Sequence, residues 1–323
     1  MIKLIILIIV VTFFAMNMGG SGIAPSFAAI YGGGLIKKKN SIALFGFFVI
    51  LGAVFLGKNV SLTLGKNLVP QRFIDFDVVL IILTSATLSL FLANILKIPQ
   101  STSQLTVGAI GGVGIYFNYL YLKTLLFKII PMWIILPLLS YLLTFLLYKI
   151  IYPPAHDNLH IYQRLFANQN KLRLSSLISG CYVAFAIGSN NVANAVGPLY
   201  GAGLLSVALG LVLIAPLFGL GAWLLGKGPI ETAGKEIVPL GLVSSTLVSF
   251  VTATLLILAS VLGIPQSLVQ LNLSSIFAIS CIKDGHNYTL DKHLTKKTFL
   301  VWMVAPIFSV ILSFLLVSLF VKR

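Results

Sequence analysis

Apolar residues run through this chain in long, nearly unbroken stretches that short polar segments separate. Most of these stretches are close to the roughly 20 residues that a helix needs to cross a ~30 Å hydrocarbon core. We therefore predict an all-α, polytopic membrane protein with about ten membrane segments. The expected segments are residues 4–31, 41–57, 76–97, 101–119, 124–150, 176–203, 207–226, 240–263, 266–282 and 298–321.

The second half of the chain repeats the pattern of the first half. Residues 15–70 align with residues 184–239 without a gap, so that Tyr31 matches Tyr200 at an offset of 169. The run Ile98-Pro99-Gln100-Ser101 returns as Ile264-Pro265-Gln266-Ser267. A duplicated hydrophobic unit with Gly- and Pro-interrupted spans is typical of a secondary transporter whose site lies between the repeats. We expect a first repeat over residues 1–151, a cytoplasmic connector over 152–175 and a second repeat over 176–323.

Composition and charge support a membrane protein and indicate its orientation. The chain is 58% hydrophobic and 9% charged, with a mean hydropathy of +1.04, which excludes a water-soluble globule. Its net charge of +15 comes from basic residues that sit singly between spans, a pattern that argues against nucleic-acid binding. With both termini outside the cell membrane, the inside segments hold 14 of the 22 lysines and arginines. An odd number of spans per repeat then makes the second repeat inverted.

Four interruptions place polar or helix-breaking residues at membrane depth, where they are costly unless they line a site. The segments Met16–Ser26 and Gly188–Pro198 hold glycines, prolines and asparagines, and we expect broken helices there. The segments Pro99–Gln104 and Pro265–Gln270 each place a proline before hydroxyl and amide residues, as at the start of a helix. Their junctions, residues 98–103 and 264–269, are either tips of re-entrant hairpins or interfacial loops. Close helix packing is the alternative explanation for the small residues.

The motifs at these interruptions resemble those of the inorganic phosphate transporter (PiT) family. Gly188-Ser189-Asn190-Asn191-Val192-Ala193-Asn194 is similar to the family's Gly-Ala-Asn-Asp-Val-Ala-Asn signature, and residues 98–103 resemble its Pro-x-Ser-Thr-Thr/Ser hairpin. The resemblance covers nearly the whole chain. It implies an inverted-repeat fold, cation-coupled uptake of an inorganic tetrahedral oxyanion, and a homodimer.

Departures from the family pattern favour its sulfate permease branch, which the Met-Asn-x-Gly-x-Ser-Gly segment at Met16–Gly22 resembles. Asn191 stands where the family has aspartate, and Gln104 stands where it has histidine. Phosphate at neutral pH carries O–H donors that a carboxylate or imidazole accepts, whereas sulfate offers acceptors only. A site without titratable groups suits sulfate, and phosphate remains the alternative.

The expected site follows from the same motifs. Half-helix N-termini and the hydroxyls would hold the oxyanion, and the asparagines would hold the anion, a coupling cation or both. Lys97 either lies near the anion or snorkels to the inside surface. The substrate-binding candidates are Ser21, Gly22, Ser101, Thr102, Ser103, Gln104, Asn190, Asn191 and Ser267, and the cation-binding candidates are Asn190, Asn191 and Asn194.

Other functional classes find less support. The spans lack paired aspartates, a His-Glu-x-x-His stretch or a Ser/His dyad, so we do not expect an intramembrane enzyme. Cys181 and Cys281 have no partner spacing, and the histidines fall in loops, so we expect no metal site and no cofactor beyond a coupling ion, H⁺ or Na⁺. The sequence leaves open a passive anion channel.

Overall fold

The computed structural model describes residues 1–95, 100–154, 156–160, 163, 167–226, 241–291 and 293–321. These residues form helices and turns, without a strand among them, which confirms the all-α prediction. The helices are α1 (Ile2–Gly32), α2 (Lys38–Leu56), α3 (Lys58–Lys66), α4 (Phe76–Ile95), α5 (Thr102–Phe117), α6 (Leu122–Thr124), α7 (Ile130–Ile151), α9 (Gln169–Asn191), α10 (Ala193–Gly201), α11 (Val207–Leu225), α13 (Leu242–Val261), α14 (Leu268–Asp284), α15 (His286–Asp291) and α16 (His293–Phe320).

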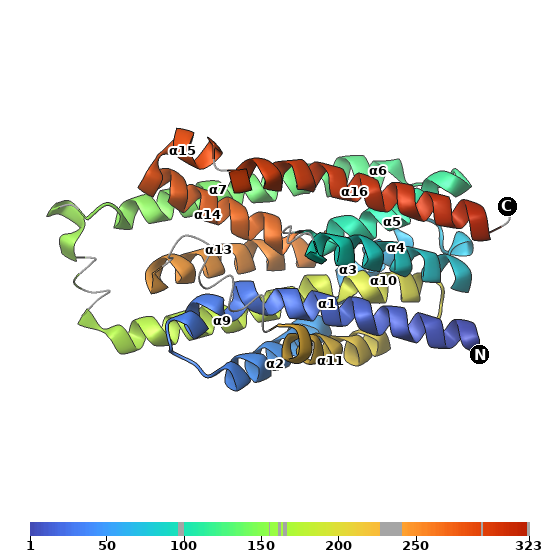
Figure 1. The fold of residues 1–323 in the computed structure, drawn as a ribbon, viewed down its shortest axis with the longest axis horizontal. Helices are drawn as coiled ribbons and strands as arrows, with labels where there is room; N and C mark the ends of the chain where they lie inside the picture. The colour runs from blue at the N-terminus through green and yellow to red at the C-terminus, as the bar shows by residue number, and fades with distance from the viewer. Residues whose placement is uncertain are drawn as a thin grey trace.

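Eight of the described helical segments are long and apolar enough to cross a membrane, so the expected count of ten is not confirmed. The difference lies in α5 and α14, which have 16 and 17 residues. At 1.5 Å per residue each reaches only about 25 Å, which is less than the ~30 Å core. Figure 1 shows that α4 and α5 form one hairpin and that α13 and α14 form another, which enters from the opposite end of the molecule. The second junction, residues 264–269, and the described part of the first, residues 100–103, therefore lie at the tips of re-entrant hairpins, and residues 96–99 lie outside the described part.

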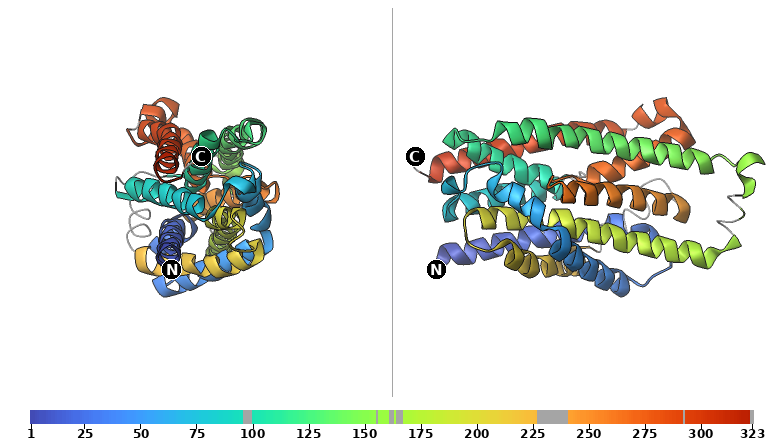
Figure 2. Two further views of the ribbon diagram at one scale, coloured as in Figure 1. Left: turned by 90° about the vertical axis from the view of Figure 1, so that its right-hand side faces the viewer. Right: turned by 180° about the vertical axis from the view of Figure 1, so that it is seen from behind.

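The two repeats run through the molecule in opposite directions. We call the end that holds both chain termini the terminal end, and the end where α7 stops and α9 starts the connector end (Figure 1). The first repeat enters with α1 at the terminal end and leaves with α7 at the connector end. The second repeat enters with α9 at the connector end and returns with α16 (Figures 1 and 2). This arrangement is the predicted inverted topology. Because α9 starts at Gln169, the last part of the segment 152–175 is already helical.

The repeats interlock through glycines that let helices of different repeats touch. Each of four glycines lies so close to a backbone carbonyl of the other repeat that a Cβ there would overlap it. Two contacts join α1 to α11 and two join α9 to α2, at matching positions 169 residues apart. The contacts are Gly19 with Phe218, Gly188 with Val49, Gly221 with Met16, and Gly52 with Phe185. The same interface thus occurs twice, as a pseudo-two-fold axis requires.

These contacts correct one expectation, the break at Met16–Ser26. Helix α1 runs without interruption from Ile2 to Gly32 and contains Pro25. Gly19 and Gly20 serve close packing against α11, which was the alternative explanation. In the second repeat the helix is interrupted only at Val192, between α9 and α10, and this residue keeps helical dihedrals (φ −60°, ψ −33°). Neither segment therefore presents the pair of open half-helix ends that the sequence led us to expect.

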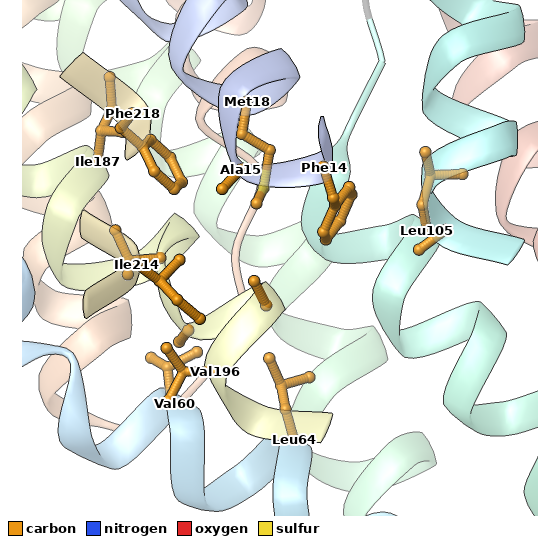
Figure 3. Close-up of a cluster of buried hydrophobic side chains, with 14 of the residues drawn as sticks. Phe14, Ala15, Met18, Val60, Leu64, Leu105, Ile187, Val196, Ile214 and Phe218 are labelled. Carbon is orange, nitrogen blue, oxygen red and sulfur yellow. The ribbon is translucent and has the colours of Figure 1, made fainter. Parts of the chain in front are cut away.

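Apolar side chains of both repeats fill the space between these helices. Figure 3 shows Phe14 and Met18 of α1 in the same cluster as Leu105 of α5 and Phe218 of α11. Phe14, Leu105 and Phe218 are completely buried. This core fixes the scaffold from which the hairpins project.

Candidate functional site

The two hairpins carry the same helix cap at their tips. Ser101 caps α5, and its Oγ accepts a hydrogen bond from the backbone N–H of Gln104 at 3.2 Å. Ser267 caps α14 in the same way, accepting from Gln270 N–H at 3.1 Å. The uncapped N–H groups of each first turn and the positive end of each helix dipole favour an anion. Two anion-favouring helix ends therefore point toward the middle of the molecule.

The two tips touch one another. We call residues 100–103 the first tip and residues 264–268 the second tip. The Ser103 hydroxyl donates to the backbone carbonyl of Gln266 at 3.0 Å. From α10, the side-chain amide of Asn194 donates to Thr102 Oγ1 at 3.3 Å and to Ser103 Oγ at 3.2 Å. The structure thus brings Thr102, Ser103 and Asn194, all predicted site residues, into one buried cluster.

Asn190 holds the second tip in place. Its amide nitrogen donates to Ser260 Oγ at 2.9 Å and to the carbonyl of Ile264 at 3.0 Å. Its amide oxygen accepts from the backbone N–H of Gln266 at 3.0 Å. Both donors of this fully buried side chain are used within the protein. This geometry suits a positioning role better than direct contact with a transported ion.

Six amide side chains in the two tips, in the first turns that follow them and at the α9–α10 junction carry buried polar atoms without a hydrogen-bond partner. Such atoms are rare in proteins, because each costs about 1–3 kcal/mol, and their concentration in these segments points to a ligand. Gln100 and Gln266 occupy matching positions in the two repeats, as do Gln104 and Gln270. The atoms are the amide oxygens of Gln104, Asn191, Asn194 and Gln270, and both amide atoms of Gln100 and Gln266.

Three of these residues, Gln100, Gln266 and Gln270, were not among the predicted site residues. The offset of 166 that aligns Ser101 with Ser267 also aligns the glutamine pairs, so the sequence contained the signal. The prediction followed the hydroxyl groups, which are fewer in the second hairpin, where Leu268 and Val269 follow Ser267.

Ser21 and Gly22 have a different environment from the other candidates. Ser21 is exposed, and its hydroxyl donates to the helix carbonyls of Asn17 and Met18, both at 3.1 Å. Gly22 packs against α2 and α9, where a Cβ would lie 3.2 Å from the Phe45 ring and 3.4 Å from Ile187. Among the described bonds, none joins either residue to the tips. Their predicted role in binding stays a prediction.

The tips are electrically neutral. Residues 100–104, 190–194 and 264–270 contain amides, hydroxyls and apolar side chains but no titratable group. Lys97 lies outside the described residues. Within the described part of the chain, no group of three or more His, Cys, Asp or Glu side chains could hold a metal ion. The arrangement can surround a small anion with N–H and O–H donors, and its amide oxygens can coordinate a cation.

Comparison with known proteins places this geometry in a family. The model of the phosphate transporter family matches residues 18–173 and again residues 157–313, once for each repeat. The chain belongs to the phosphate transporter family. It is therefore a multi-pass membrane transporter for an inorganic anion such as phosphate or sulfate, and not an enzyme, as the sequence predicted.

Individual relatives agree with this assignment. The chain is 40% identical over 311 residues to the sulfate permease CysP of Bacillus subtilis, covering 96% of this chain and 86% of the relative. It is 24% identical over 384 residues to a Pyrococcus furiosus protein named as a phosphate permease, covering 93% and 92%. Its fold is similar to that of a solved sodium-dependent phosphate transporter, with a TM-score of 0.83, 23% identity and 99% of each chain covered.

Proposed function

We propose that this protein imports sulfate in preference to phosphate, and that the anion binds where the two hairpin tips meet. The observation that carries the proposal is the pair of capped helix N-termini, at Ser101 and Ser267, that meet in a buried site without a titratable side chain. A sulfate dianion has no proton to donate, so it requires donors alone. Backbone N–H groups, hydroxyls and amide N–H groups supply them.

The neutral amides discriminate between the two anions. A carboxylate in place of Asn191 would repel a dianion and would accept the O–H of a protonated phosphate. The side-chain amides of Gln104 and Gln270 can rotate so that either the NH₂ group or the oxygen faces an anion, because the hydrogen bonds of an amide set its orientation. The similarity to a permease named for sulfate supports this choice. Phosphate, for which the family is named, is the alternative substrate.

Transport is coupled to a cation in this proposal. The amide oxygens of Asn191 and Asn194 are buried without partners, and neutral oxygens are suitable ligands for Na⁺. A proton carrier would need an ionisable group, which residues 100–104, 190–194 and 264–270 do not contain. Na⁺ is therefore our first choice of coupling ion and H⁺ the second. The bond between Ser103 and Gln266 joins the two tips across the middle of the molecule, which favours a transporter over a passive channel.

The distribution of lysines and arginines between the two ends indicates the orientation of the protein in its membrane. At the connector end the described basic residues outnumber those at the terminal end, and by the positive-inside rule this supports a cytoplasmic connector end in a plasma-membrane protein. Both termini are then outside, and the homodimer implied by the family resemblance remains part of the proposal. The connector-end residues are Lys37, Lys38, Lys39, Lys149, Lys171, Arg173, Lys283 and Lys296, and those at the terminal end are Lys3, Lys66, Arg72, Lys123 and Lys128; Lys58, the first residue of α3, is counted at neither end.

Uptake of labelled sulfate into proteoliposomes tests the proposal. We expect concentrative uptake that an imposed Na⁺ gradient drives and an ionophore abolishes, with phosphate a weak competitor. Uptake driven by a pH gradient instead would assign the coupling to H⁺. Equilibration without concentration would indicate a channel, and stronger competition by phosphate than by unlabelled sulfate would make phosphate the substrate.

A further inference from the structure

A groove with a volume of about 610 Å³ lies between α7 and α16, beside the second tip, whose Pro265 carbonyl accepts a hydrogen bond of 2.8 Å from Trp133 in the groove wall. Helix α7 packs on α14, and α16 packs on α5, and Figure 2 (left) shows α7 and α16 standing apart from one another. Residues of both helices line the groove. Gln104 and Gln270 lie at its floor, and Trp133 and Trp302 line its opposite walls. Each of these pairs consists of matching positions in the two repeats. The pseudo-two-fold axis therefore passes through the groove.

The groove opens sideways, toward the surroundings of the protein. Its outer edges are Ile134 and Leu138 of α7 and Met303 of α16, which are 58%, 63% and 73% exposed. Both helices are long enough to span the membrane, and their spanning windows are among the least buried of the described spans. At this depth the surroundings are hydrocarbon, so lipid has direct access to the groove.

The lining is wrong for a hydrated dianion. Apart from Gln104, Gln270, Ser274 and Thr289, the inner part of the groove presents mainly aromatic and aliphatic side chains, among them Trp133, Pro137 and Phe277. An anion moving along this surface would lose its hydration and gain few donors. The groove is thus unsuited to conducting the transported anion, and it matches an apolar occupant.

The length of the groove matches one leaflet of a bilayer. The α7 residues that line the groove run from Ile130 to Tyr141, over which the helix rises about 16 Å at 1.5 Å per residue, close to half of a ~30 Å core. At its connector end the groove reaches His286, whose ring lies 6.1 Å from that of Phe145. Lys149 follows one turn further along the same face of α7 and is exposed. A chain that extends from the tips would end beside these two basic side chains.

Two other lysines of this end have partners of their own. Lys296 pairs with Asp291 at 3.0 Å, and Lys283 lies over the ring of Tyr152 at 5.9 Å. Of the basic side chains that the structure describes at this end, Lys149 and His286 can face a negative charge at the mouth of the groove. We propose that the groove binds one acyl chain of an anionic phospholipid from the connector-side leaflet, with the phosphate at Lys149 and His286.

The three tryptophans of the chain make this proposal measurable. In three variants, each keeping one of Trp133, Trp223 or Trp302 and replacing the others with Phe, fluorescence is recorded in vesicles whose lipids carry brominated acyl chains. Trp223 on α11 is 64% exposed and serves as the lipid-facing control. We expect bromine near the chain end to quench Trp133 and Trp302 as strongly as it quenches Trp223, and aqueous acrylamide to have little effect on them.

Headgroup recognition needs a separate comparison. Brominated anionic lipid, diluted into unlabelled zwitterionic lipid, should quench Trp133 more than brominated zwitterionic lipid at the same level. Lys149→Ala should abolish this preference, whereas Lys171→Ala, at the same end on α9, should keep it. Strong acrylamide quenching would show a water-filled groove and overturn the proposal. If both tryptophans are protected from both quenchers, and this protection disappears when the protein is diluted to monomers, the groove binds a second copy of the chain instead. If Lys149→Ala keeps the preference for brominated anionic lipid, the proposed headgroup contact is wrong.

Discussion

The hydroxyl of Ser103 in the first repeat donates a hydrogen bond to the carbonyl of Gln266 in the second repeat, at 3.0 Å. Two hairpins that enter from opposite ends of the molecule therefore meet through a direct bond. Ser103 also accepts a hydrogen bond from Asn194, so its oxygen joins both tips to α10. Any movement that separates the tips must break this bond, and the residues around it are the natural place to test how the transporter works.

Loss of the Asn190 side chain should destabilise the protein as well as impair transport. Asn190→Ala leaves the Ile264 carbonyl and the Gln266 N–H without their buried partner, whereas Ser260 keeps its bonds to Ser189 and Leu256. At about 1–3 kcal/mol for each unsatisfied group, we expect a loss of at least roughly 2 kcal/mol, measured by thermal unfolding in detergent. The matched control is Ser21→Ala at the equivalent position of the first repeat, which removes only bonds to its own helix. Unchanged stability of Asn190→Ala with a higher half-saturating sulfate concentration would instead make Asn190 a ligand.

The two serine caps should act alike. Ser101→Ala and Ser267→Ala each remove a cap that is worth about 1 kcal/mol and a hydroxyl beside the anion. Loss of one charge-assisted bond of roughly 1.5–3 kcal/mol would raise the half-saturating sulfate concentration about tenfold or more. Uptake kinetics at equal surface expression measure this effect. If both variants transport like the wild type, the tips do not bind the anion.

The interlocking glycines should tolerate no side chain. Gly19→Ala and Gly188→Ala would each force apart two helices of different repeats, because the added methyl overlaps a backbone carbonyl. We expect each to cost more than about 2 kcal/mol or to prevent folding, since overpacking typically costs 1–3 kcal/mol and backbone cannot move aside cheaply. Gly111→Ala in α5 is the control, because a Cβ there would meet nothing within 4 Å. Normal folding of Gly188→Ala by size-exclusion profile would contradict the close approach of α9 and α2.

The architecture was largely predictable, because it depends on pattern. Hydropathy and the offset of 169 identify the membrane segments and the inverted repeat without knowledge of any contact. The span count was not predictable in the same way, because the apolar stretches at α5 and α14 resemble membrane spans in the sequence, and the short length and return direction of these helices appear only in the structure. The prediction of a broken helix at Met16–Ser26 was wrong for a related reason. Glycine is needed both at a broken helix and at a close helix contact, and the partner helix decides which.

The candidate site was predictable in part. Asn194, Thr102 and Ser103 meet as expected from the motifs. The positioning role of Asn190 depends on which groups the second tip presents to it, and composition does not contain that information. Asn190, Asn191 and Asn194 are chemically alike in the sequence, and only the fold gives them different partners.

The inverted topology can be tested directly by finding the side of the membrane from which a thiol reagent labels each of two introduced cysteines. In a background with Cys181 and Cys281 replaced by serine, Lys66→Cys at the terminal end and Lys171→Cys at the connector end should react from opposite sides of the membrane. We expect an impermeant thiol reagent to label Lys66→Cys in intact cells and Lys171→Cys only after permeabilisation. Labelling of both from outside would contradict the inverted arrangement, and the reverse pattern would invert the proposed orientation.

The most direct test of the central claim, that a neutral site between the hairpin tips selects sulfate, is the ratio of sulfate to phosphate uptake in the variant Asn191→Asp/Gln104→His. Both replacements are close in shape to the native side chains and restore groups that accept a phosphate O–H. We predict a fall in the ratio of at least about tenfold relative to wild type in proteoliposomes, equivalent to roughly 1.4 kcal/mol of differential binding. An unchanged ratio with a new Na⁺ dependence would show that Asn191 faces the cation, and a wild-type protein that prefers phosphate would contradict the account.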